Sequence, residues 1–122
     1  MAKFTHDDVL DAALDKIATA TILTVCSTQP TTRTEAVTTY KLADVTVDSG
    51  DFTKANGDTS GRKVTVGAQS AVPVDTSGTA LHIALCDGSI LLHVTTCTSQ
   101  ALTAGNTVNV PAFDVEFADV TP

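Results

Sequence analysis

A run of alternating apolar residues around one Asp-Gly pair limits the fold of this chain more than any other feature. The run is Thr79-Ala-Leu-His-Ile-Ala-Leu-Cys-Asp-Gly-Ser-Ile-Leu-Leu-His-Val-Thr-Thr96, with Asp87 and Gly88 at its centre. Asp-Gly between alternating apolar segments is a strong signal for a two-residue type I′ hairpin, because both central residues of that turn have positive φ. We therefore expect an antiparallel hairpin here, and an antiparallel β protein around it.

A two-residue loop would also fix which residues of the hairpin face each other. The expected pairs are Cys86 with Ser89, Leu85 with Ile90, Ala84 with Leu91, Ile83 with Leu92, His82 with His93, and Leu81 with Val94. One face of this hairpin would be purely aliphatic, and the other would be mixed. Such a face pattern is typical of a sheet that covers a single core.

The first twenty residues predict one α-helix, over about residues 6–19. Thr5 is placed to cap its N-terminus, and Asp8 follows three residues later, at the position of the acidic partner in a capping box. Leu10, Leu14 and Ile17 then recur at helical spacing, which indicates one buried face.

The remainder of the chain reads as short strands separated by turns. Strands are expected at 21–27, 40–47, 63–68, 72–74, 107–110 and 113–120, beside the two hairpin strands. Val72-Pro-Val74 is expected at a sheet edge, because proline cannot donate a hydrogen bond to a ladder. Residues 48–62 and 98–106 are expected to be loops.

Composition supports one β-rich domain spanning residues 1–122. The chain has 43% hydrophobic residues but only 4% aromatic ones, so its core must consist mainly of aliphatic side chains. Its 22 threonines suit the solvent-facing side of strands. We predict a mainly β fold, an antiparallel β-sandwich or small barrel over about residues 21–120, preceded by the helix at 6–19.

The charge distribution argues against nucleic acid and membrane partners. The net charge is −7, and all seven basic residues lie at or before Lys63. A surface of that kind repels phosphate, so we expect no direct binding of nucleic acid. The chain shows neither an apolar run of transmembrane length nor the apolar segment of a signal peptide, so we expect synthesis in the cytoplasm and no membrane span.

Three short motifs resemble a phosphate-binding loop or an aspartic protease site, but none has the residue spacing that such a site needs. Residues 57–63, Gly-Asp-Thr-Ser-Gly-Arg-Lys, resemble a phosphate-binding loop, yet the glycine spacing is wrong and a strand is expected to follow. Asp-Thr-Ser-Gly occurs at 58–61 and 75–78, where an extra serine breaks the aspartic protease pattern. We interpret both copies as turns.

The histidines and cysteines are the remaining candidates for a site. His82 and His93 would be opposed in the predicted hairpin, but two histidines make too few ligands for a required metal. Cys26, Cys86 and Cys97 are expected to be small buried apolar groups, with a disulfide within or between subunits as the alternative. No nucleophile has a base at a recognised spacing, so we expect no enzyme activity, no catalytic residues and no cofactor.

Several segments together resemble small virion structural proteins of tailed bacteriophages and prophages. The segments, in chain order, are Asp8–Ile17 (DVLDAALDKI), Val25–Thr32 (VCSTQPTT), Glu35–Leu42 (EAVTTYKL), Gly57–Lys63 (GDTSGRK), Ser77–Leu85 (SGTALHIAL) and Gly105–Phe117 (GNTVNVPAFDVEF). The resemblance covers nearly the whole chain. It implies a structural role without an active site.

The resemblance implies a capsid decoration protein that binds other virion proteins and further copies of itself. A neck, collar or tail component of the virion is the alternative of the same kind. A second alternative is a carbohydrate- or receptor-binding β module that uses the loops at 48–62 and 98–106. Such modules usually stack aromatic side chains on their ligands, and only Tyr40 and Phe52 are candidates here.

Overall fold

A computed structural model of the chain describes residues 6–58 and 60–117, and it confirms a mainly β fold with one N-terminal helix. The elements are α1 (Asp7–Ile17), β1 (Ile22–Cys26), the π-helical turn η1 (Glu35–Thr39), β2 (Lys41–Thr46), the 3-10 turn η2 (Ser49–Asp51), β3 (Phe52–Asn56), β4 (Arg62–Val66), β5 (Gln69–Pro73), β6 (Gly78–Cys86), β7 (Leu91–Leu102), β8 (Thr107–Val110) and β9 (Phe113–Phe117).

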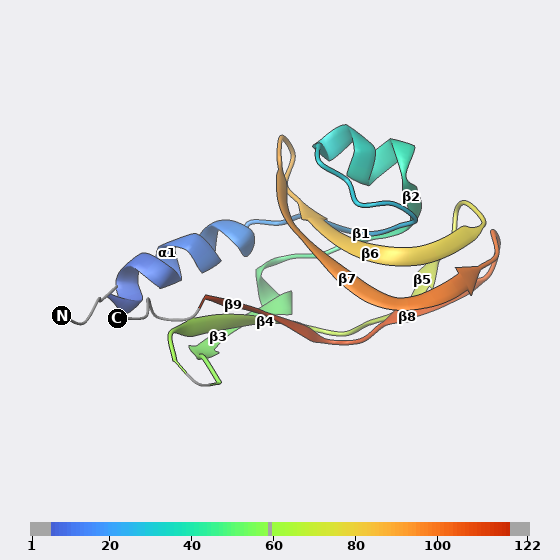
Figure 1. The fold of residues 1–122 in the computed structure, drawn as a ribbon. Helices are drawn as coiled ribbons and strands as arrows, with labels where there is room; N and C mark the ends of the chain where they lie inside the picture. The colour runs from blue at the N-terminus through green and yellow to red at the C-terminus, as the bar shows by residue number, and fades with distance from the viewer. Residues whose placement is uncertain (1–5, 59, 118–122) are drawn as a thin grey trace.

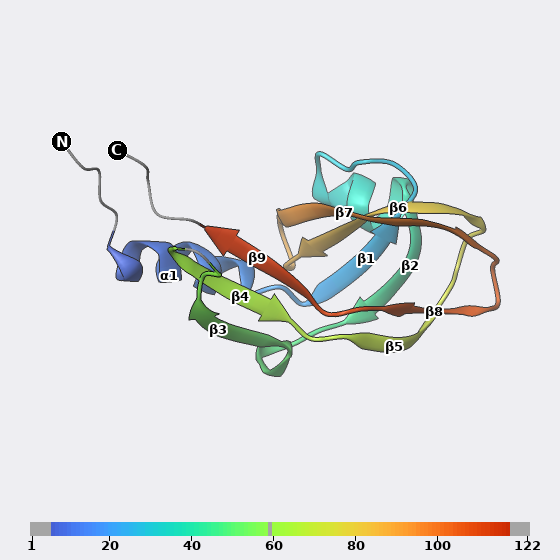
Figure 2. The same cartoon turned by 60° about the horizontal axis from the view of Figure 1, so that its bottom comes forward.

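The strands form two layers (Figure 1). One layer is a four-stranded antiparallel sheet in the order β2-β1-β6-β7. The other contains the three-stranded sheet β3-β4-β9 and the pair β5-β8, which follow one another along the chain because β4 leads into β5 and β8 into β9 (Figure 2). The described part of the chain shows no pairing between β7 and β8, so the arrangement is sandwich-like and not a closed barrel.

The main core lies between these layers and is aliphatic, as the composition predicts. Leu23 on β1 and Leu85 on β6 are register partners and are fully buried, and Val64 on β4 lies in the same core. A smaller cluster occupies the opposite face of the four-stranded sheet, under η1. Its buried members are Cys26, Ala36, Ala84 and Cys86.

Helix α1 packs on this domain through two of the residues predicted for its apolar face. Leu14 and Ile17 are buried in the main core, while Leu10 is only half-buried. The N-cap is His6, whose Nδ1 accepts a hydrogen bond from the backbone N–H of Asp8 at 3.0 Å. The predicted cap, Thr5, lies outside the described residues.

The predicted hairpin between β6 and β7 exists, but its predicted register is wrong. Asp87 Oδ1 accepts hydrogen bonds from the backbone N–H groups of Ser89 and Ile90, both at 2.7 Å, which closes a longer turn. Positive φ among the described residues is confined to Ala71, Gly61 and Gly105, so neither Asp87 nor Gly88 adopts the type I′ conformation.

A bulge beside this turn then shifts the partners along the hairpin. The observed pairs are Cys86 with Leu91, Leu85 with His93, Ala84 with Val94, Ile83 with Thr95, and His82 with Thr96. A second irregularity, between Ala80 and His82, leaves Leu81 outside the ladder with 39% of its surface exposed. The expected aliphatic face therefore keeps Ile83 and Leu85 but loses Leu81.

Two predicted loops contain parts of strands. Residues 48–62 contain η2 and β3, and residues 98–102 belong to the end of β7, so neither stretch is a long open loop. The segment Val72-Pro-Val74 does lie at a sheet edge, because β5 belongs to a two-stranded sheet and pairs with β8 alone. Pro73 pairs with Thr107 of β8, and Val74 forms a bridge to Ala43 of β2.

Candidate functional site

The two histidines do not form the opposed pair that the predicted register implied. His82 pairs with Thr96 and shares its face with Ala84, which lies in the smaller cluster, whereas His93 pairs with Leu85 of the main core. Successive residues of a strand point to opposite faces, so His82 and His93 lie on different sides of the sheet. Over residues 6–58 and 60–117, no group of three metal-binding side chains is present.

The half-buried His93 gives the protein a predicted dependence on pH. Burial lowers the pKa of His93 below its ordinary value of 6.5, so the unfolded chain binds this proton better than the folded one. The stabilisation that neutral His93 provides is thus present above about pH 6.5 and is lost as the pH falls below it. We expect acid to lower the melting temperature of the wild type more than that of His93→Gln, and equal pH dependence would contradict this.

The three cysteines are free thiols in different surroundings. Cys26 and Cys86 are fully buried in the smaller cluster, as predicted, and Cys97 is half-buried between the layers. Burial raises the pKa of all three thiols, which keeps them protonated and weakly reactive.

Cys97 also lines a cavity of about 190 Å³ between β7 and β8. Its lining residues are Val25, Ala80, Ile83, Cys97, Thr98, Gln100, Val108, Asn109, Val110 and Pro111. The members on β1 and β6 are apolar and buried, and Thr98, Gln100 and Asn109 at the rim are exposed. The chemistry of this cavity is that of a shallow apolar recess with a neutral polar rim.

The Asp-Thr-Ser-Gly segment at 58–61 directly precedes β4, and the one at 75–78 ends on Gly78, the first residue of β6. Asp58 Oδ1 lies 2.7 Å from Lys63 Nζ, and Asp75 Oδ2 lies 3.2 Å from Lys41 Nζ. The same Lys41 ammonium lies 3.3 Å from Asp44 Oδ1, so it contacts two neighbouring carboxyl groups and offsets the charge of one. Asp58 and Asp75 each form an ion pair with a lysine, and Asp75 also shares a hydrogen bond with Asp44, which is the largest cause that lowers the pKa of Asp75.

Every basic side chain in the described part of the chain is held by an acidic side chain or a backbone carbonyl. The pairs are Lys16 with Asp87, Arg33 with the Asp87 carbonyl, Lys41 with Asp44 and Asp75, Lys54 with Asp15, Arg62 with Asp11, and Lys63 with Asp58 and Asp114. A phosphate group would have to displace one of these partners, and this includes Lys63 of the loop that resembles a phosphate-binding motif.

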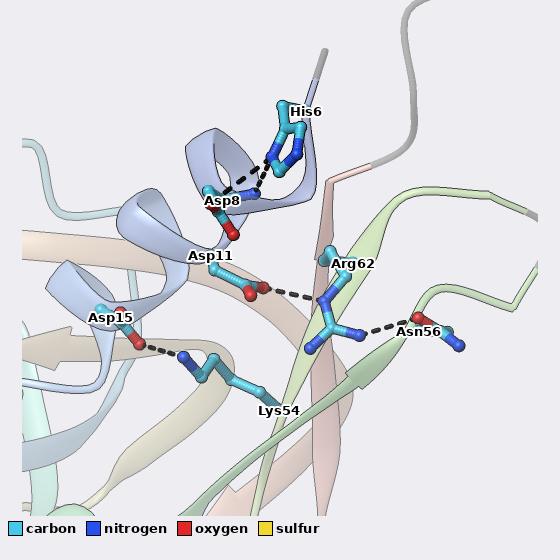
Figure 3. A network of polar contacts seen from close by, with 7 residues as sticks. All are labelled: His6, Asp8, Asp11, Asp15, Lys54, Asn56 and Arg62. Atoms are coloured by element: carbon cyan, nitrogen blue, oxygen red, sulfur yellow. Dashed lines mark hydrogen bonds and ion pairs between the residues drawn. The ribbon is translucent and has the colours of Figure 1, made fainter.

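The most structured of these networks fastens α1 to the second layer (Figure 3). Arg62 on β4 places Nε 2.8 Å from Asp11 Oδ1 and Nη1 2.7 Å from Asn56 Oδ1. One turn further along α1, Asp15 Oδ1 lies 2.7 Å from Lys54 Nζ on β3. Two acidic residues of α1, Asp11 and Asp15, therefore help to hold the helix against the second layer.

The sequence interpretation overlooked the longest interval without charge. Residues 88–113 contain no Asp, Glu, Lys or Arg, and this interval forms β7, β8 and the rim of the cavity. Charged residues are depleted at the centres of protein interfaces, so such an interval is itself a signal for a contact surface.

Comparison with protein-family models, with curated proteins and with solved structures found no match. None of the helices among residues 6–58 and 60–117 has the length and apolar character needed to cross a membrane.

Proposed function

We propose that this chain is a non-enzymatic structural protein of a tailed bacteriophage virion, and specifically a capsid decoration protein. It would be made in the cytoplasm of the host bacterium and would then bind coat subunits and further copies of itself on the head. Its task would be to hold neighbouring subunits together. It would use neither a cofactor nor direct contact with nucleic acid.

The observation that carries the proposal is the internal use of the charged groups. Phosphate-binding proteins need cationic side chains that can reach the ligand. In the described part of this chain, the lysine and arginine side chains form contacts within the fold. One example is the ion pair of Arg62 with Asp11, which joins β4 to α1. The surface groups that remain for contact with other molecules are acidic or neutral and polar. Such a surface suits a structural protein that binds other proteins and catalyses no reaction.

The chain-long resemblance adds to this support, because its segments fall on the scaffold of the fold. They include parts of α1, β1, β2, β6, β8 and β9, together with the turn that leads into β4. Because the similar segments lie on the helix and strands that build the fold, the resemblance applies to the whole domain and not to one local site.

The packing of the two candidate aromatic residues gives less support to the carbohydrate- or receptor-binding alternative. Tyr40 packs against the smaller cluster, and Phe52 packs against the main core. Neither aromatic ring stands free on a loop, and each loop proposed for binding contains part of a strand. The neck, collar or tail alternative concerns the same class of protein and differs in position and copy number.

The experiment is quantitative mass spectrometry of purified virions, with the copy number expressed relative to the major coat protein. We expect a copy number of the same order as that of the coat subunit. A copy number typical of a single ring would reassign the protein to the neck or tail. Absence from purified particles, with presence in infected cytoplasm, would overturn the structural role altogether.

A further inference from the structure

The neutral interval at 88–113 concentrates on one side of the molecule, at the gap between β7 and β8. We define the seam surface as the exposed side chains that flank this gap: Thr98, Ser99, Gln100, Asn109 and Pro111. The turn that joins β7 to β8 lies at the end of the molecule opposite to α1 (Figure 1, Figure 2). The seam surface is therefore separate from the charged network that fastens the helix.

The outer strands of the two larger sheets, β7 excepted, carry charges that discourage contact with a second strand. The short strands β5 and β8, which pair with each other, are also without charge. The edge strand β2 contains Lys41 and Asp44, and β3 contains Lys54. Strand β9 contains Asp114 and Glu116. By contrast, the 12 residues of β7, which ends the four-stranded sheet, include no Asp, Glu, Lys or Arg.

The cavity gives the seam surface an apolar centre. Buried Val25, Ala80 and Ile83 form apolar parts of its wall, and exposed Thr98 and Gln100 stand at its rim. An apolar centre surrounded by neutral polar groups has the anatomy of a protein interface. A volume of about 190 Å³ is enough to receive an apolar side chain of another chain.

We propose that the seam surface is where a second copy of this chain docks. Two copies with a net charge of −7 each repel one another over most of their surfaces. A partner of opposite charge would gain from the acidic regions, so neutrality offers it no advantage. For a second copy, however, the electrostatic repulsion is weakest where the two chains meet through the uncharged seam surface. The absence of charge there therefore favours a second copy as the binding partner.

The contact that we propose is made mainly by side chains and not by one long ladder. The pairing of β7 with β6 is irregular at two places, between Leu91 and His93 and between Thr96 and Gln100, which divides it into two short regular runs. Bulges of this kind bend an edge and oppose open-ended strand addition. A limited, closed contact between copies is compatible with such an edge.

This inference rests on the proposed function in one respect, because a protein present in many copies needs a contact between them. The contact itself is measured on the purified protein. We expect sedimentation equilibrium to show reversible dimers or larger closed oligomers as the concentration rises to about 1 mM. That is the order of effective concentration for subunits held close together.

The decisive comparison is between two double variants of identical composition. Thr98→Glu with Gln100→Glu adds two charges to the seam, and Thr28→Glu with Gln29→Glu adds the same charges to exposed positions after β1. We expect the seam variant to associate at least about tenfold more weakly than the control, because like charges would meet in the contact. Melting curves check that both variants fold.

A wild type that stays monomeric to about 1 mM would overturn the inference, as would equal association of the seam and control variants. Neither result would affect the copy number in virions, so the proposed function would stand or fall separately. Suppose the wild type is monomeric and only the seam variant fails to bind isolated heads. The occupant of the seam would then be a coat subunit and not a second copy.

Discussion

Replacing Leu85 with alanine should lower the free energy of unfolding by about 2–5 kcal/mol. Leu85 has no exposed surface and lies on β6, an inner strand of the four-stranded sheet, opposite Leu23 of β1. Both layers surround the side chain, so the structure has little freedom to collapse into the space that its removal would leave. The loss therefore includes the transfer of the side chain to water and the cavity left behind.

Urea denaturation followed by circular dichroism measures this loss, with Leu81→Ala as the matched control. Leu81 lies on the same strand but outside the ladder, and 39% of its surface is exposed. We expect the control to cost less than about 1 kcal/mol. Equal losses for Leu81→Ala and Leu85→Ala would mean that the bulge in β6 and the core position of Leu85 are wrong.

Strong periodic patterns made several elements predictable from the sequence. In β9, Phe113, Val115 and Phe117 alternate with acidic residues, and the structure confirms that the apolar residues face the core. Helix α1 was predictable for the same reason, because Leu14 and Ile17 recur at helical spacing. In each case the apolar residues recur often enough at one spacing to distinguish the period of a helix from that of a strand.

The prediction of the hairpin register was wrong because a local side-chain interaction determines the shape of the turn. The Asp-Gly signal assumes that the backbone alone closes the turn, whereas the Asp87 carboxylate accepts two backbone hydrogen bonds and lengthens the loop. A shift of one residue moves side chains to the opposite face of a sheet, so the predicted pairing of His82 with His93 failed with it.

The ion pairs that hold α1 and the position of the seam surface could not be predicted, because both depend on residues that are far apart in the sequence. Asp11 meets Arg62 across 51 positions of sequence, and no local pattern encodes such a pairing. Strand β3 was missed because only Phe52 and Ala55 of its five residues are partly buried. The charge-free interval was visible in the sequence, but its concentration around one cavity required the fold.

Replacing Leu14 with alanine should cost about 2–5 kcal/mol and should destabilise the whole domain, not only the helix. From the sequence, the apolar stripe of this helix could equally dock on a partner protein. The structure instead buries Leu14 completely in the protein's own core, and ion pairs from Asp11 and Asp15 hold the helix against β4 and β3. Helix and sheets should therefore unfold in one cooperative transition.

The matched control is Val9→Ala on the same helix, because Val9 is 61% exposed. Alanine is the better helix former, so this change should leave the stability within about 0.5 kcal/mol of the wild type or raise it slightly. Urea unfolding of both variants, followed at a helix-sensitive and a sheet-sensitive wavelength, separates the two possibilities. A Leu14→Ala loss below about 1 kcal/mol, or a helix that melts before the sheets, would show that the helix is available to a partner after all.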